Sequence, residues 1–330
     1  MKKKLAYLLV CSPNLGFAAG NVALGINKYS SQKDYDILVY HTGLHLQDKQ
    51  AFKKIPHVRL VNYQLPEKFI KDVMPRLPKG RWNNPNSMLS FAHYEVFNLL
   101  DKYHKVIWLD VDVSIQGDLS ELERFEGIAI PYDAASDGVF NVRHQFNQNI
   151  AGFNMTPPSH CNAVIVVSDT LNNYQQLYRF CWETSKTYAP CFNNPDQAVF
   201  ELMYQTFNFQ PKVVPWLKFC CFSTNKMAHI AHIVHFGTET KVWNTNWLLQ
   251  SFPEWYRTHL RWLELGGSDF DSEGLDVSNI APTYETLLHD INKMRWPKWM
   301  INMLCWVVPK EKNRRHIRAK YIRTINSHKN

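Results

Sequence analysis

The sequence predicts an α/β fold, and three observations support this prediction. Short apolar runs alternate with helix-like segments through the first half of the chain, as strands and helices do in an α/β sheet. Hydrophobic residues make up 45% and charged residues 20% of the 330 residues, so a large core can be buried. Basic residues collect at one end: residues 291–330 hold eleven Lys or Arg and one acid, although the whole chain has a net charge of +8. The body is therefore near neutral, which argues against a protein covered with nucleic-acid contacts.

The first half predicts strands and helices in strict alternation. The apolar run at residues 5–11 resembles a signal peptide after its three lysines, but it is short and Ser12-Pro13-Asn14 interrupts it, so a first strand ending in a turn explains it better. The next elements are a helix at 17–29, a strand at 36–40, a helix at 46–54, a strand at 57–62, an amphipathic helix at 89–100 and a strand at 105–109. No run reaches the about 20 apolar residues that a membrane-spanning helix needs.

The second half continues the pattern less regularly. Strands are expected at 127–131, 163–167, 212–215 and 232–236, and helices at 170–188 and 197–207. Residues 133–159 are rich in Asn, Gln and Pro and predict a long loop or lid, of a length that is usually functional or disordered. The domain is expected to cover residues 1–265, followed by a linker at 266–283 and a tail at 284–330.

The cysteines indicate a reduced protein. There are seven, an odd number without a Cys-x-x-Cys pair, and a chain of this length needs no disulfide to fold. We expect mostly structural thiols in a cytosolic compartment.

The strongest chemical signal is the pair of carboxylates Asp110 and Asp112 directly after the apolar strand at 105–109. Open α/β sheets bind ligands at the carboxyl ends of their strands. Paired carboxylates there suit Mg²⁺ or Mn²⁺ holding a diphosphate. A phosphatase of the haloacid-dehalogenase type, with Asp110 as nucleophile, uses nearly the same string, but the second acidic pair that it needs is not found after residue 160.

Three later motifs extend this signal. Asn162-Ala163 begins an apolar strand, Asp196-Gln197 begins a helix, and His235 follows an apolar run with Lys241-Val-Trp243 behind it. With the Leu-Asp-x-Asp strand, they stand in the order found in glycosyltransferase family 8, which the chain resembles over roughly residues 5–247. The resemblance implies a GT-A fold, Rossmann-like with a mixed central sheet. The residues after this region separately predict a helical basic and aromatic tail.

The resemblance also implies roles for single residues. It makes Asp110, Asp112 and His235 ligands of Mn²⁺ (or Mg²⁺), although His229 and His232 are alternative third ligands. It places Gln197, Asp196 and Asp133 at the reacting sugar, with Gln197 nearest the anomeric centre. The residues implied to bind the donor are Asn14, His93, Val111, Asn162 and Lys241, the last at the diphosphate.

Some positions depart from the family pattern. Acids that commonly touch the uracil are replaced by Ser12-Pro13-Asn14, and a common Arg is replaced by His93. Asn-Ala-Gly becomes Asn162-Ala163-Val164, and Lys-Pro-Trp becomes Lys241-Val242-Trp243. A UDP-sugar donor is therefore expected from the family habit alone.

The tail predicts the location of the acceptor. A Trp-rich apolar run at 296–308 precedes seven cations at 310–323, a combination typical of a helix in the headgroup region of an anionic leaflet. A helix docked on the body, or a nucleic-acid arm, are the alternatives. The resemblance implies a retaining glucosyl- or galactosyltransferase. From the tail we expect this enzyme to be peripheral on the cytoplasmic face of the cell membrane and to act on a lipid-linked glycan of the lipopolysaccharide or capsule type. A non-catalytic sugar- or membrane-binding module is the remaining rival.

Overall fold

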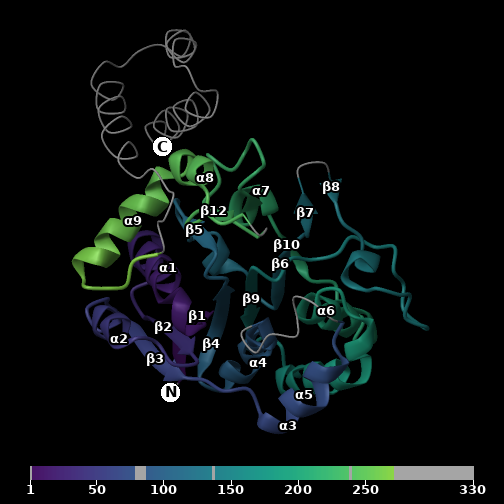
Figure 1. Ribbon diagram of the computed structural model, residues 1–330. Coiled ribbons are helices and arrows are strands. Elements are labelled where there is room, and N and C mark those ends of the chain that lie inside the picture. The colour runs from purple at the N-terminus through teal and green to yellow at the C-terminus, as the bar shows by residue number, and fades with distance from the viewer. Residues whose placement is uncertain (1, 79–86, 136–137, 238–239, 271–330) are drawn as a thin grey trace.

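A seven-stranded mixed sheet forms the centre of the molecule (Figure 1). The computed structural model describes residues 2–78, 87–135, 138–237 and 240–270, so the predicted tail lies outside the described residues. The strand order is β10-β6-β9-β4-β1-β2-β3, and β9 runs antiparallel to both of its neighbours. These strands are β1 (Lys3–Cys11), β2 (Tyr35–His41), β3 (Val58–Asn62), β4 (Tyr103–Leu109), β6 (Ile128–Pro131), β9 (Val164–Ser168) and β10 (Lys212–Val214).

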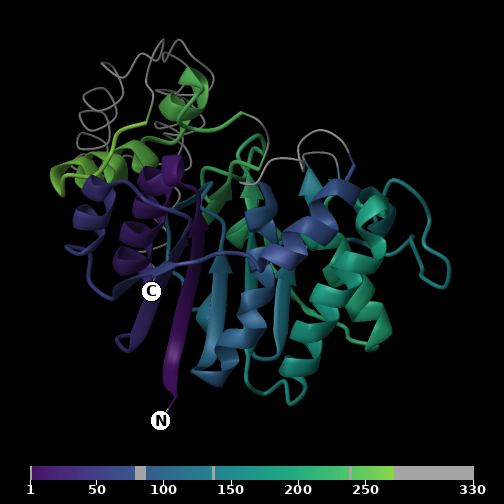
Figure 2. The same cartoon turned by 60° about the horizontal axis from the view of Figure 1, so that its bottom comes forward.

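Helices cover both faces of this sheet (Figures 1 and 2). One face carries α1 (Gly16–Tyr29), α2 (Leu46–Phe52) and α9 (Pro253–Glu264). The other carries α3 (Glu67–Val73), α4 (Glu95–Asn98), α5 (Tyr174–Tyr188) and α6 (Pro195–Thr206). Because successive strand residues point to opposite faces, Tyr7 and Leu9 join the first core while Ala6 and Leu8 join the second. Burial on both faces explains why the strands read as continuous apolar runs.

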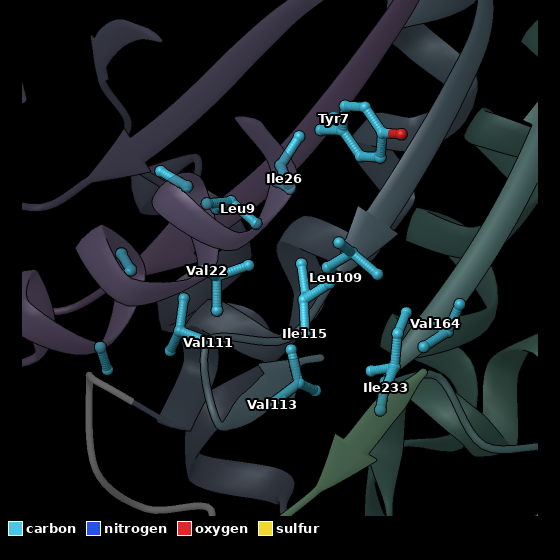
Figure 3. Close-up of a cluster of buried hydrophobic side chains, with 14 of the residues drawn as sticks. Tyr7, Leu9, Val22, Ile26, Leu109, Val111, Val113, Ile115, Val164 and Ile233 are labelled. Atoms are coloured by element: carbon cyan, nitrogen blue, oxygen red, sulfur yellow. The ribbon is translucent and has the colours of Figure 1, made fainter. Parts of the chain in front are cut away.

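A second, three-stranded sheet lies beyond one end of the large sheet. It has the order β11 (Cys221–Phe222), β12 (Ile233–His235) and β5 (Val113–Ile115), with the short helices α7 (Trp216–Phe219) and α8 (Asn246–Ser251) nearby. Figure 3 shows Val113, Ile115 and Ile233 in the same buried cluster as Val22 of α1. The small sheet is thus anchored in the core of the large one.

The strands predicted from the sequence are confirmed with small shifts of their ends, and so are the helices at 17–29, 46–54, 170–188 and 197–207. The amphipathic helix expected at 89–100 is wrong: the chain forms a 3₁₀ segment at Ser87–Tyr94, then α4, then a further 3₁₀ turn at Leu99–Asp101. The segment has almost no solvent face, because six of the eight residues Ser87–Tyr94 are buried, so no amphipathic stripe exists.

The long loop expected at 133–159 is largely irregular, with a short hairpin of β7 (Ala134–Ala135) and β8 (Gly138–Val139) and a 3₁₀ turn at Val142–Gln145. Its backbone is tied to the body at several points. Asp133 donates its backbone N–H to the carbonyl of Ser159, and Asn193 donates to that of Gln145. These bonds hold the loop beside the end of the sheet.

Two C-terminal features differ from expectation. Helix α9 was not predicted, although Trp255, His259 and Trp262 recur at helical spacing and are buried. Gly20 of α1 allows the close approach, since a Cβ there would lie 2.3 Å from the Trp262 ring. The predicted linker begins inside the packed body, because Ser268 hydrogen-bonds both Trp262 and Asp48. In the part of the chain that the structure describes, no helix is long and apolar enough to cross a membrane.

Candidate functional site

A cavity of about 520 Å³ opens at the carboxyl end of β4. This volume is typical of a pocket for a small organic ligand. Every site residue predicted from the sequence lines the cavity except Asn14. Asn14 is exposed on the turn after β1, and its neighbour Leu15 takes the place in the lining.

The mixed sheet brings Asp110 and Asn162 together. Because β9 is antiparallel to β4, the beginning of β9 lies beside the end of β4. Asp110 donates its backbone N–H to the carbonyl of Ala163 at 2.9 Å, one residue past Asn162. Residues about fifty positions apart in the sequence therefore meet at one edge of the sheet.

The small sheet brings His235 to Asp112. In the antiparallel pair of β12 and β5, His235 lies opposite Val113, and Phe236 donates its backbone N–H to the carbonyl of Asp112 at 2.9 Å. The imidazole Nε2 is 3.5 Å from Asp112 Oδ1. Of the other histidines considered, His232 bonds the carbonyl of Asp118 and His229 stacks on Phe252, so His235 is the one at the carboxylates.

The arrangement of Asp110, Asp112 and His235 fits a divalent cation. One ligand atom from each lies within 4.8 Å of the others. Asp112 Oδ1 is buried and has no hydrogen-bond partner among the described residues, which is the state expected of an atom reserved for a cation. Gly237 leaves room for a cation to approach His235 Nε2, because a Cβ at this position would lie 2.7 Å from that nitrogen. Two carboxylates and an imidazole suit Mn²⁺ or Mg²⁺.

Lys241 supplies a cation at the same place. Its Nζ donates to Asp112 Oδ2 and to the carbonyl of Phe236, both at 2.6 Å. Burial opposes ionisation of Asp112, but His235 and Lys241 outweigh it and lower the pKa of this carboxyl. Burial likewise opposes the charge on His235, yet Asp112 raises the pKa of the imidazole well above its usual value. The Asp112 carboxylate therefore stays ionised inside the protein, because two cationic side chains face it.

A second polar chain leads from Asp110 into the cavity. His93 lies between two carboxylates, with Nε2 3.4 Å from Asp110 and Nδ1 3.4 Å from Asp196. Asn162 donates its side-chain N–H to Asp196 Oδ2 at 3.1 Å, and no partner for its Oδ1 appears in the described ranges. Burial raises the pKa of Asp196, and Asp110 adds to this effect, while His93 opposes it. Polar atoms without partners mark this wall as one built for a polar ligand.

Gln197 and Asp133 lie on the neighbouring wall. Gln197 donates its side-chain N–H to the carbonyl of His160 at 3.1 Å, which fixes the amide at the start of α6. Asp133 accepts a 2.8 Å hydrogen bond from Gln145. Burial raises the pKa of the Asp133 carboxyl, although this hydrogen bond acts to lower it. Gln145 thus positions a predicted residue and was not itself predicted.

Trp108 is a further residue that the sequence analysis did not identify. Its indole N–H donates to Asp110 Oδ1 at 2.7 Å, and its ring lies over His93 at 3.8 Å between centroids. The available signal was a single Trp in the apolar run 106–109, two residues before the carboxylate. Phe140 and His144, stacked at 4.2 Å, also line the cavity from the 133–159 loop.

Comparisons with known proteins agree with this geometry. Residues 8–247 match the family described as glycosyl transferase family 8. A human relative, glycosyltransferase 8 domain-containing protein 2, is 32% identical over 111 residues, which cover 31% of this chain and 30% of that protein. The chain therefore matches less than a third of the length of this curated relative.

Two solved structures share the fold at low identity. The galactosyltransferase LgtC, in complex with donor and acceptor sugar analogues, matches with a TM-score of 0.57 and 12% identity over 82% of this chain and 99% of that chain. The bifunctional glycosyltransferase WbbM matches with a TM-score of 0.57 and 13% identity over 80% of this chain and 51% of that chain. The likeness identifies a GT-A-like α/β fold with a mixed central sheet.

Proposed function

This chain is a glycosyltransferase family 8 enzyme, and from that premise we propose that it is a metal-dependent, retaining hexosyltransferase. It moves glucose or galactose from a UDP-sugar onto a lipid-linked surface glycan. The family match spans most of the chain, so the rival readings, a phosphatase with Asp110 as nucleophile and a non-catalytic module, are set aside.

One observation carries the proposal: Asp110, Asp112 and His235 converge in a cavity whose wall also presents Lys241. These three side chains would hold Mn²⁺ (or Mg²⁺). When bound, such a cation supplies a Lewis acid that offsets negative charge on a departing diphosphate. Lys241 adds a fixed positive charge beside it and needs no reorganisation during the reaction.

The sugar is proposed to lie against other residues of the cavity lining. Asn162 and Asp196 offer an amide and a carboxylate to hydroxyl groups, and Gln197 and Asp133 lie nearby. An amide such as Gln197 is a weak nucleophile, so a covalent glycosyl-enzyme is not the route we favour. We instead propose front-face attack by the acceptor hydroxyl, with the donor configuration retained. Val111 and His93, both in the lining, would contact the donor near Asp110.

A donor panel tests this proposal. Purified protein is incubated with Mn²⁺ and UDP-, GDP- and CDP-sugars, and slow hydrolysis of the donor is measured. We expect turnover of one UDP-hexose, dependent on the metal and abolished by a chelator. Hydrolysis of a generic phosphate ester without turnover of any sugar nucleotide would contradict the proposal.

The acceptor part of the proposal rests on the sequence of the tail. The seven cations at 310–323 are each expected to contribute on the order of 1 kcal/mol near an anionic leaflet, beside the Trp-rich run. The tail would hold the enzyme at the inner face of the membrane, where a lipid-linked acceptor is concentrated.

We expect truncation after Pro309 to release the protein from anionic vesicles while donor hydrolysis continues. High salt should release the full chain in the same way, because it screens the electrostatic attraction. Vesicle flotation measures both effects, with neutral vesicles as the control. A truncated chain that still floats with anionic vesicles would show that the tail does not carry the attachment.

A further inference from the structure

Two buried cysteines lie behind His235, on the side away from the carboxylates. Cys161 Sγ and Cys220 Sγ are 3.8 Å apart, and each is 3.9 Å from His235 Nδ1. Cys161 is 3% exposed and Cys220 is 1% exposed. The imidazole therefore separates an oxygen-lined group at Nε2 from a sulfur-lined group at Nδ1.

The local fold brings these three side chains together. Cys161 immediately precedes Asn162 at the entry to β9, and Cys220 immediately precedes β11. In the parallel pair of β11 and β12, Cys221 lies opposite Val234 and Phe222 lies opposite His235. Thiols that the sequence suggested were structural thus meet the imidazole of the candidate metal site.

We propose that Cys161, Cys220 and His235 Nδ1 form a second site, which binds a thiophilic divalent cation of the zinc class. Two sulfurs at about 2.3 Å from a tetrahedral zinc lie about 3.8 Å apart, as these two do. A sulfur and a nitrogen in that geometry lie about 3.6 Å apart, so a shift of about 0.3 Å suffices. On binding, both thiols and the Nδ1–H of His235 release their protons to solvent.

The cation has a route to this site. Cys161 and His235 both line the 520 Å³ cavity, so an ion that enters the cavity reaches Cys161 first, and Cys220 lies 3.8 Å behind it. The cavity also leaves space for a water molecule or a further ligand to complete a three-residue site. Three protein ligands with an open position are a common arrangement for zinc.

Occupation of this site opposes metal binding at the carboxylates, a consequence that rests on the proposed function. A neutral imidazole has one nitrogen lone pair for a metal, and its other nitrogen carries a proton. If Nδ1 binds the thiophilic cation, Nε2 bears the proton and turns an N–H toward Asp112. The ion proposed at Asp110 and Asp112 then loses its third ligand. Zinc is therefore an inhibitor of this enzyme that acts through the sulfur site.

Cobalt reports binding at the sulfurs independently of activity. The reduced protein, kept in a phosphine reductant, is titrated with Co²⁺, and the cobalt–thiolate charge-transfer absorption is recorded. We expect the band in the unaltered chain and in Asp112→Asn, and its loss in Cys220→Ala. Cys221→Ala is the matched control, because Cys221 is also buried but has its sulfur beside the carbonyl of Phe222, and it should keep the band.

Inhibition by Zn²⁺ completes the test. At constant Mn²⁺, the concentration for half-inhibition should rise at least about tenfold in Cys220→Ala and stay unchanged in Cys221→Ala, each relative to its own zinc-free rate. A cobalt–thiolate band that survives in Cys220→Ala would show that Cys220 is not a ligand, and zinc inhibition unaltered by that change would place the inhibitory ion at the carboxylates. Either result overturns the inference. A band that depends on Cys220 in a protein without donor turnover supports the sulfur site and rejects the proposed function instead.

Discussion

Asp112→Asn is expected to lower donor turnover by about 10²- to 10³-fold, the loss typical of one preorganised electrostatic group. The change removes the carboxylate that faces both His235 and Lys241. The amide that replaces it has no charge to offer a cation. Mn²⁺-dependent affinity for UDP should fall together with turnover, and calorimetry with and without the metal measures this.

Asp118→Asn is the matched control for this change. Asp118 is an exposed carboxylate six residues further on, outside the cavity lining, and it bonds Ser120. Its replacement should leave turnover and metal-dependent affinity as they are. Thermal unfolding of both variants separates a local effect from loss of the fold. If folded Asp112→Asn retained metal-dependent UDP affinity, the metal assignment would be wrong.

Asp196→Asn should lower turnover by about 10²-fold, through loss of a group that acts on the reacting sugar. Asp196 accepts a hydrogen bond from Asn162 and faces His93, and it lines the same cavity as Lys241. Replacement of the Asp196 carboxylate leaves Asp112, His235 and Lys241 in place. Affinity for UDP with Mn²⁺ should therefore change little while kcat falls, in contrast to the result for Asp112→Asn.

Steady-state kinetics beside UDP calorimetry distinguishes these two effects, with Asp118→Asn again as the control. The outcome that contradicts the assignment is an equal loss of UDP affinity and turnover in Asp196→Asn. Such a result would mean that Asp196 acts at the nucleotide or holds the metal site together, and not at the sugar.

The large sheet and the position of the carboxylates were predictable from local patterns. Strands buried on both faces appear as continuous apolar runs, as in β1, β4 and β9, and the end of such a run marks the ligand-binding edge. Asp110 and Asp112 stand at the end of β4, so their location followed from the strand itself. The third metal ligand could not be chosen from local patterns, because the choice of His235 over His229 or His232 depends on the pairing of β12 with β5.

Contacts between distant segments were not predictable in the same way. The packing of Trp108 over His93 depends on a 3₁₀ segment that has no amphipathic signature. Cys161 and Cys220 carry no spacing motif, and they meet because β9 and β11 begin at the same place in the fold. Asn14 illustrates the reverse case: its position in the sequence suggested a donor contact, but the turn directs it to solvent and brings Leu15 to the cavity.

A crystal soaked with Mn²⁺ and UDP would test the central claim most directly, by anomalous scattering at the manganese edge. We predict an anomalous peak between Asp110, Asp112 and His235 Nε2, with the diphosphate on the Lys241 side. A diphosphate bound in the cavity without a peak at these three residues, or manganese bound elsewhere with UDP, would contradict it.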